Sequence, residues 1–185
     1  ALEKLIFGGD GEVVNAERTA MVPAQPAVLE VGMTEADLSN KNLGAGGAII
    51  VGAWISHKDN GALVKFDISD NGLCAAGAKT LAKALKDNQI MTELNIASNY
   101  LSRTEASEYS GESDMSGVIA IGNAIPTMGA LTSLNLASNY LRAEGAKHVA
   151  QAIKVNVSVL RFDWYHFELD LTSGSTAVVD GYSYY

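Results

Sequence analysis

Apolar residues recur through the middle of the chain in a fixed arrangement. Each copy places them at its first, fourth and sixth positions, as in Leu63, Phe66 and Ile68. The arrangement recurs at Met91, Leu94 and Ile96, and at Leu131, Leu134 and Leu136. Because alternate residues of a strand share one face, the fourth and sixth positions predict a short half-buried strand. The first residue is expected to enter the core just before that strand.

The copies are regular enough to count as repeats. They begin at Met33, Leu63, Met91 and Leu131, and a partial fifth begins at Leu160. The third interval is longer than the others by about a dozen residues. The excess falls at about 102–116, in the acidic stretch SRTEASEYSGESDMS. We interpret it as an insertion into an otherwise regular array.

Each expected strand is followed by the same polar and small residues. The asparagines at this point are Asn71, Asn99 and Asn139. Their amides suit a turn that leaves a strand. Glycines follow, each expected to open a helix: Gly47, Gly77, Gly117 and Gly145. In 77–88 the apolar residues are spaced i, i+3, i+4, i+7, which predicts an amphipathic helix with lysines on its outer side.

The pattern LxxLxLxxNxL, followed by a Gly-Ala helix at 28–30 residues per unit, resembles the ribonuclease-inhibitor-like class of leucine-rich repeats. The resemblance covers about 33–167. It implies an α/β fold, a right-handed α/β horseshoe solenoid, with a short curved parallel sheet on the concave face and helices outside. In the first unit, Lys41 replaces the asparagine and Ala36 replaces a larger core residue. We therefore expect that unit to behave as a partly degenerate cap.

Both ends of such an array need capping, because terminal repeats otherwise expose apolar faces. Residues 1–32 are expected to form a hairpin-like N-terminal cap, with strands at 5–7 and 27–31 and an irregular loop between them. Residues 33–160 hold four repeats. This organisation predicts one domain with short extensions.

Residues 161–185 are expected to form a C-terminal cap and aromatic tail. The aromatic run 162–167 predicts a strand, and 177–179 a second strand that closes a hairpin. The alternative is an adhesive edge for self-association or for a partner strand.

The amino-acid composition and net charge argue against several classes of function. Of the 185 residues, 48% are hydrophobic and 18% charged, and the net charge is −8. This balance argues against long disorder and against a surface for nucleic acid or anionic membrane. The longest apolar run, 45–55, is too short to span a membrane, which takes about twenty residues. The single cysteine, Cys74, excludes an intrachain disulfide framework.

Cysteine scarcity favours the cytoplasm. The chain does not begin with Met and shows no signal-peptide pattern, so a secreted or surface location stays open. Asn156-Val157-Ser158 is a glycosylation sequon, which matters only in a secreted protein.

The sequence contains only incomplete versions of the motifs that indicate ligand binding or catalysis. The glycines of 44–48 precede a helix, but Ile49 stands where a dinucleotide fingerprint needs Gly or Ala. The calcium-loop pattern that starts at Asp67 fails at Ala78, where a bidentate Glu is required. Three dispersed histidines and a cysteine without a base suggest neither metal site nor nucleophile. The acidic insertion is expected to be a solvated loop, with weak divalent-ion or partner binding as the alternative. We therefore expect no catalytic residue, metal or cofactor, and no enzyme.

Outward strand positions form rows across the expected sheet. The charged row is Glu35, Lys65, Glu93, Ser133 and Arg161. The acid–amide row is Asp37, Asp67, Asn95, Asn135 and Asp163. A third row is small except at its end: Ser39, Ser69, Ala97, Ala137 and Tyr165. Small residues would let a ligand approach the sheet closely.

These rows predict a protein-recognition face on the concave sheet. The expected contact residues are Glu35, Asp37, Lys65, Asp67, Glu93, Asn95, Asn135, Arg161, Asp163 and Tyr165. Simple soluble surface is the competing interpretation. Two other functions remain open: a regulatory subunit similar to GTPase-activating leucine-rich repeat proteins, and a structural component joined through the C-terminal edge.

Overall fold

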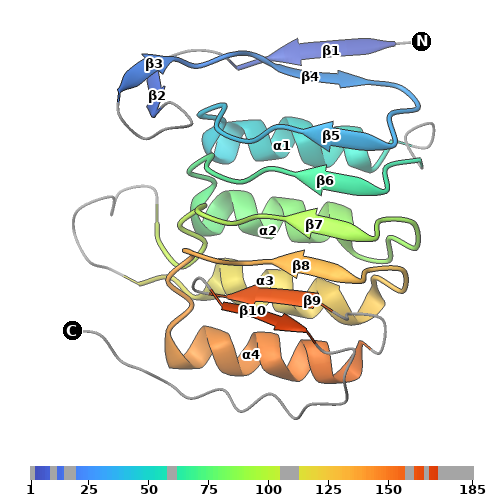
Figure 1. Ribbon diagram of the computed structural model, residues 1–185, viewed down its shortest axis with the longest axis vertical. Helices are drawn as coiled ribbons and strands as arrows, with labels where there is room; N and C mark the ends of the chain where they lie inside the picture. The colour runs from blue at the N-terminus through green and yellow to red at the C-terminus, as the bar shows by residue number, and fades with distance from the viewer. Residues whose placement is uncertain are drawn as a thin grey trace.

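The computed structural model describes residues 3–8, 12–14, 20–57, 62–104, 113–156, 161–164 and 167–170, with the backbone alone in 12–14, 161–164 and 167–170. Strands and helices alternate through its middle (Figure 1). In chain order the elements are β5 (Glu35–Asp37), α1 (Gly44–Ile55), β6 (Lys65–Asp67), α2 (Cys74–Leu85), β7 (Glu93–Asn95), α3 (Ser116–Ala124), the 3-10 helix η2 (Ile125–Thr127), β8 (Ser133–Asn135), α4 (Arg142–Val155), β9 (Arg161–Trp164) and β10 (Phe167–Asp170). The fold is mixed α/β, as expected.

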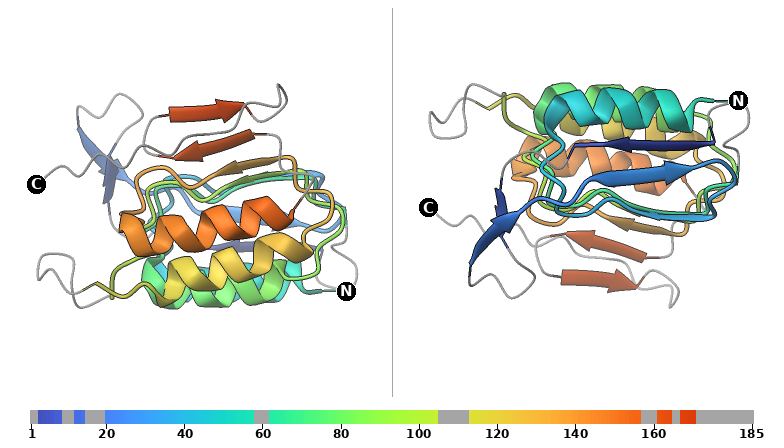
Figure 2. Two further views of the ribbon diagram at one scale, coloured as in Figure 1. Left: turned by 90° about the horizontal axis from the view of Figure 1, so that it is seen from below. Right: turned by 90° about the horizontal axis from the view of Figure 1, so that it is seen from above.

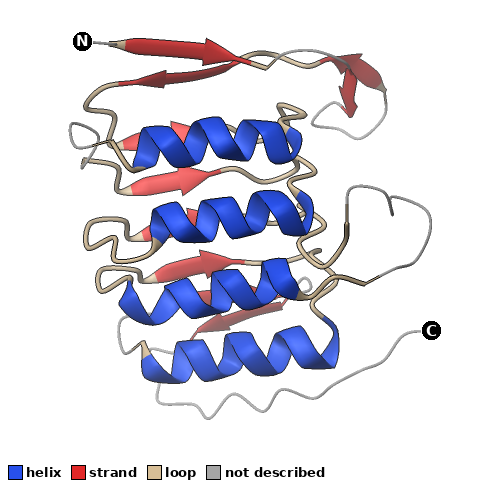
Figure 3. Cartoon of the chain, turned by 180° about the vertical axis from the view of Figure 1, so that it is seen from behind, coloured by secondary structure: helices blue, strands red, loops and turns tan. Residues whose placement is uncertain are grey.

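One sheet organises these elements. Strands β5, β6, β7, β8 and β9 lie side by side in chain order and run parallel, and β10 pairs antiparallel with β9 at the edge. All four helices lie on one side of this sheet (Figure 2). Each helix packs against the next along the stack (Figure 3). The helices therefore leave the opposite face of the sheet uncovered.

The core lies between the sheet and the helices, and the repeated apolar positions fill it. Leu63, Phe66 and Ile68 are all buried, and so are their counterparts in the next two units. The first unit, expected to be partly degenerate, forms its strand. Ala36 is buried in β5 and pairs in register with Phe66. The smaller side chain is accommodated without loss of the strand.

The repeated asparagines are buried and form a ladder. Asn99 donates from Nδ2 to the carbonyls of Ile96 at 3.2 Å and Ala97 at 3.0 Å, which belong to its own turn. It also donates to Ile68 O at 2.9 Å in the preceding unit. Asn71 and Asn139 make the same two kinds of bond. The predicted turn bond is confirmed, and the bond between units is an addition.

The helices begin before the glycines that were expected to open them. The helix α1 starts at Gly44 and α2 at Cys74, each three residues ahead of Gly47 and Gly77. The glycines matter instead because they lack a side chain where two units pack closely. A Cβ at Gly117 would lie 2.4 Å from Leu101 O and 2.7 Å from Ala75 Cα. Glycine therefore lets one helix approach the preceding unit closely.

The N-terminal segment forms two antiparallel pairs. The predicted strands are present as β1 (Lys4–Phe7) and β4 (Ala27–Glu30), which pair with each other. Buried residues of β4 join the main core. The irregular loop expected between them is wrong, because β2 (Glu12–Val14) and β3 (Met21–Pro23) pair there.

The C-terminal hairpin is present, but its second strand differs from the expected one. It is β10, which follows β9 after two residues. The strand expected at 177–179 lies outside the described residues, as does the rest of the aromatic tail. None of the described helices combines the length and apolar character needed to cross a bilayer.

The insertion leaves the stack between α2 and α3. Its two ends meet in an antiparallel bridge between Arg103 and Ser113. Asp114 N donates to Ser102 O at 2.8 Å just beyond that bridge. Residues 105–112, with three of the four insertion carboxylates, lie outside the described residues. The two ends of the insertion are therefore held together at its base by this bridge and the adjoining hydrogen bond.

Candidate functional site

The charged row is in register on the uncovered face of the sheet. Glu35, Lys65 and Glu93 are directly opposite one another on β5, β6 and β7, and Ser133 follows on β8. Lys65 Nζ lies 3.3 Å from Glu93 Oε1 and 3.7 Å from Glu35 Oε1. The three side chains remain 47–67% exposed. They form a chain of ion pairs that a partner could reach.

The electrostatics of Lys65 follow from these neighbours. Its hydrogen bond to Glu93 and the charges of Glu93 and Glu35 raise the pKa of Lys65 above its ordinary value. The two carboxylates therefore stabilise the charged ammonium group, which lies between them and offsets their mutual repulsion. The row offers alternating charges for recognition.

Side chains of the acid–amide row lie on the sheet surface and also form hydrogen bonds that stabilise the fold. Asp67 Oδ1 accepts the backbone N–H of Ser69 at 2.9 Å and its hydroxyl at 2.6 Å. Asn95 Nδ2 donates to Asp67 Oδ2 at 2.7 Å, which ties β7 to β6. Asp37, Asn95 and Asn135 likewise accept the N–H two residues further on. Sequence reasoning missed this role, although an Asp or Asn two residues before a turn is its signal.

The C-terminal ends of the rows are placed by backbone register alone. Arg161 pairs with Ser133, and Asp163 pairs with Asn135, so both rows continue onto β9. Tyr165 lies outside the described residues. The structure thus brings nine of the ten predicted contact residues onto adjacent strands.

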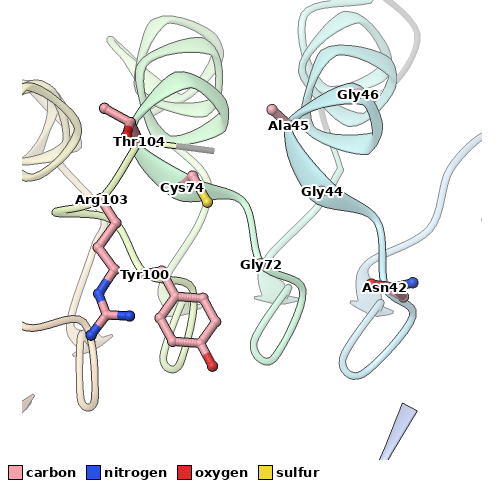
Figure 4. A pocket seen from close by; sticks show the side chains of 9 residues that line it. All are labelled: Asn42, Gly44, Ala45, Gly46, Gly72, Cys74, Tyr100, Arg103 and Thr104. Atoms are coloured by element: carbon pink, nitrogen blue, oxygen red, sulfur yellow. The ribbon is translucent and has the colours of Figure 1, made fainter. Parts of the chain in front are cut away.

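A second feature lies where the loops enter the helices, and sequence reasoning did not find it (Figure 4). A cavity of about 380 Å³ extends over the starts of α1 and α2, between Asn42 and Tyr100. The Tyr100 and Tyr140 rings stack with centroids 6.1 Å apart. Arg103 Cζ lies 5.3 Å from the first centroid and 4.2 Å from the second. The cation binds both rings and holds the base of the insertion against the loops.

The glycines of 44–48 line this cavity without forming a phosphate cradle. Gly44 N donates to Asn71 O at 2.8 Å, and Gly47 N donates to Leu43 O at 2.8 Å. Two of the amides that would bind phosphate are therefore engaged. Within the described part of the chain, no three His, Cys, Asp or Glu side chains gather in a way that could hold a metal ion.

No family model and no curated protein matches this chain. Among solved structures, the chain is similar to actin-binding site 2 of leiomodin-1, with a TM-score of 0.59. Sequence identity is 22%, and the alignment covers 74% of this chain and 72% of that chain. At this identity the likeness shows the fold alone.

Proposed function

We propose that this chain is a protein-recognition module built from leucine-rich repeats of the ribonuclease-inhibitor-like class, and that it binds a partner on the uncovered sheet face. The observation that carries the proposal is the charged row. Glu35, Lys65 and Glu93 lie in register, exposed, on a parallel sheet that has all of the described helices on its other side. Complementary charge patterns give specificity and speed association. The proposed role is binding without catalysis.

The fold likeness supports a protein partner. The similar structure is described as an actin-binding site, so actin is one partner to assay first. The partner itself is best sought by affinity capture with the intact chain.

The test compares two double variants in that capture. Lys65→Ala with Glu93→Ala removes the centre of the charged row and leaves the loop-supporting bonds of the acid–amide row in place. Glu144→Ala with Lys147→Ala is the matched control, because it also removes one acidic and one basic side chain, both exposed on α4 on the helix side. We expect partner binding to fall at least tenfold, roughly 1.4 kcal/mol or more, in the sheet variant alone. Equal retention by both variants would reject the sheet face.

A further inference from the structure

Asn156, the first residue of the sequon, ends α4 and is 6% exposed. Its amide nitrogen Nδ2 donates to Ile125 O at 2.6 Å and to Met128 O at 3.0 Å. Both amide hydrogens are therefore used, and both bonds reach about thirty residues back to the segment around η2. The side chain fastens the end of α4 to the preceding unit.

The corresponding place after α2 is also an asparagine. Asn88 Oδ1 accepts the N–H of Ile90 at 2.9 Å and of Met91 at 2.8 Å. An asparagine at this point of the unit thus organises the return from helix to strand. Asn156 stands at the same point of its unit but uses Nδ2 instead, to donate to carbonyls of the preceding unit, and the tripeptide pattern does not reveal this role.

We infer that glycosylation of Asn156 and native packing of α4 against η2 exclude each other. Attachment forms a bond from Nδ2 to the anomeric carbon of a lipid-diphosphate-linked sugar. Nδ2 loses a proton, and the lipid diphosphate leaves. One of the two buried hydrogen bonds must then be lost, and a sugar must start from an atom enclosed between α4 and η2. The sequon can therefore accept a sugar only while the end of α4 is not packed against η2.

The experiment is secretion of the full chain, behind a cleavable signal peptide, from a host that glycosylates. A second chain carries Arg142→Asn with Glu144→Ser, which adds a sequon at exposed positions in the first turn of the same helix. Position 142 has φ 51°, a conformation that asparagine adopts readily. Ser158→Ala removes the natural sequon and keeps Asn156. Glycan occupancy is measured by mass spectrometry in the protease-resistant, folded fraction and in the protease-sensitive fraction.

In the folded fraction we expect occupancy at Asn156 to be at least about tenfold below that at position 142. Any glycan on Asn156 should be confined to the protease-sensitive fraction, and Ser158→Ala should then increase the folded yield. Folded, protease-resistant protein that carries a glycan on Asn156 and melts at the temperature of Ser158→Ala would overturn the inference.

Discussion

The side-chain oxygen of Asn99 accepts the backbone N–H of Asn71 at 3.1 Å, so one unit closes the turn of the unit before it. Asn139 binds the N–H of Asn99 in the same way at 2.8 Å. These bonds are buried, and a buried group that loses its partner costs about 1–3 kcal/mol. The ladder therefore couples each unit to the one before it.

Substitution of Asn99 by Ala should be among the most destabilising single changes. It removes acceptor and donor together and leaves several backbone groups of two units unpaired. We expect a loss of about 3–5 kcal/mol in the free energy of unfolding, measured by urea denaturation. Asn95→Ala, on the half-exposed sheet face, is the matched control and should cost under about 1.5 kcal/mol. Similar losses for the two variants would contradict a special role for the ladder.

Two glycines with open surroundings should respond in opposite directions. A Cβ at Gly72 or at Gly46 meets no atom within 4 Å, but Gly72 has φ +62° and Gly46 lies in ordinary helix. Gly72→Ala should therefore destabilise the protein by about 1 kcal/mol. Gly46→Ala should stabilise it by about 0.5 kcal/mol, because alanine favours helix. Because neither added Cβ meets a neighbour, the melting temperatures of the two variants report the effect of backbone conformation alone. Equal shifts in melting temperature would contradict this explanation.

A second pair of glycines should differ because only one of them lies close to the backbone of a neighbouring unit. A Cβ at Gly117 would collide with the backbone of Leu101 and Ala75, whereas one at Gly122 would lie 3.7 Å from its nearest neighbour. Gly117→Ala should cost at least about 2 kcal/mol through displaced backbone. Gly122→Ala should be neutral or slightly stabilising in the same denaturation assay. If Gly117→Ala is tolerated equally well, the approach of α3 to the preceding unit is looser than described.

The base of the insertion should confer a pH dependence. The hydroxyl and then the backbone N–H of Ser116, which donates to Asp114 Oδ1 at 2.9 Å, lower the pKa of Asp114 below its usual 3.8. Because the folded pKa is the lower one, the stabilisation is complete above the unfolded pKa and is lost as pH falls through the folded value. Asp114→Ala should cost about 1 kcal/mol at pH 7 and much less near pH 2. A cost that does not change with pH would exclude this carboxylate as the source.

The charged row should matter little for folding. Exposed ion pairs contribute at most about 1 kcal/mol, and salt screens them. Lys65→Ala should therefore change the free energy of unfolding by less than about 1 kcal/mol, with a smaller change in high salt. Circular dichroism and urea denaturation check this directly. A larger loss would mean that a binding defect in this variant reflects damaged folding.

The repeated motif predicted the parallel strands and the alignment of Glu35 with Lys65, because each copy places its strand at the same point of the motif. It did not predict where α1 begins, since the Gly47 signal reports close packing rather than a helix start. Nor did it reveal β2 and β3, whose pairing lacks the repeated pattern. The bonds of Asp67 to Ser69, and the Arg103 stack on Tyr100, depend on side-chain geometry that a linear pattern does not encode.

Each asparagine of the ladder binds back into the unit before its own. If the first unit detaches, Asn71 loses partners for its side chain, while the turn of the second unit keeps its bonds to Asn99. If the last unit detaches, the backbone N–H groups of Asn99 and Leu101 lose the oxygen of Asn139. The two ends consequently lose different groups. Departure at the C-terminal end leaves backbone N–H groups of the next turn unpaired, whereas departure at the N-terminal end leaves an asparagine side chain without its partners in the departed unit.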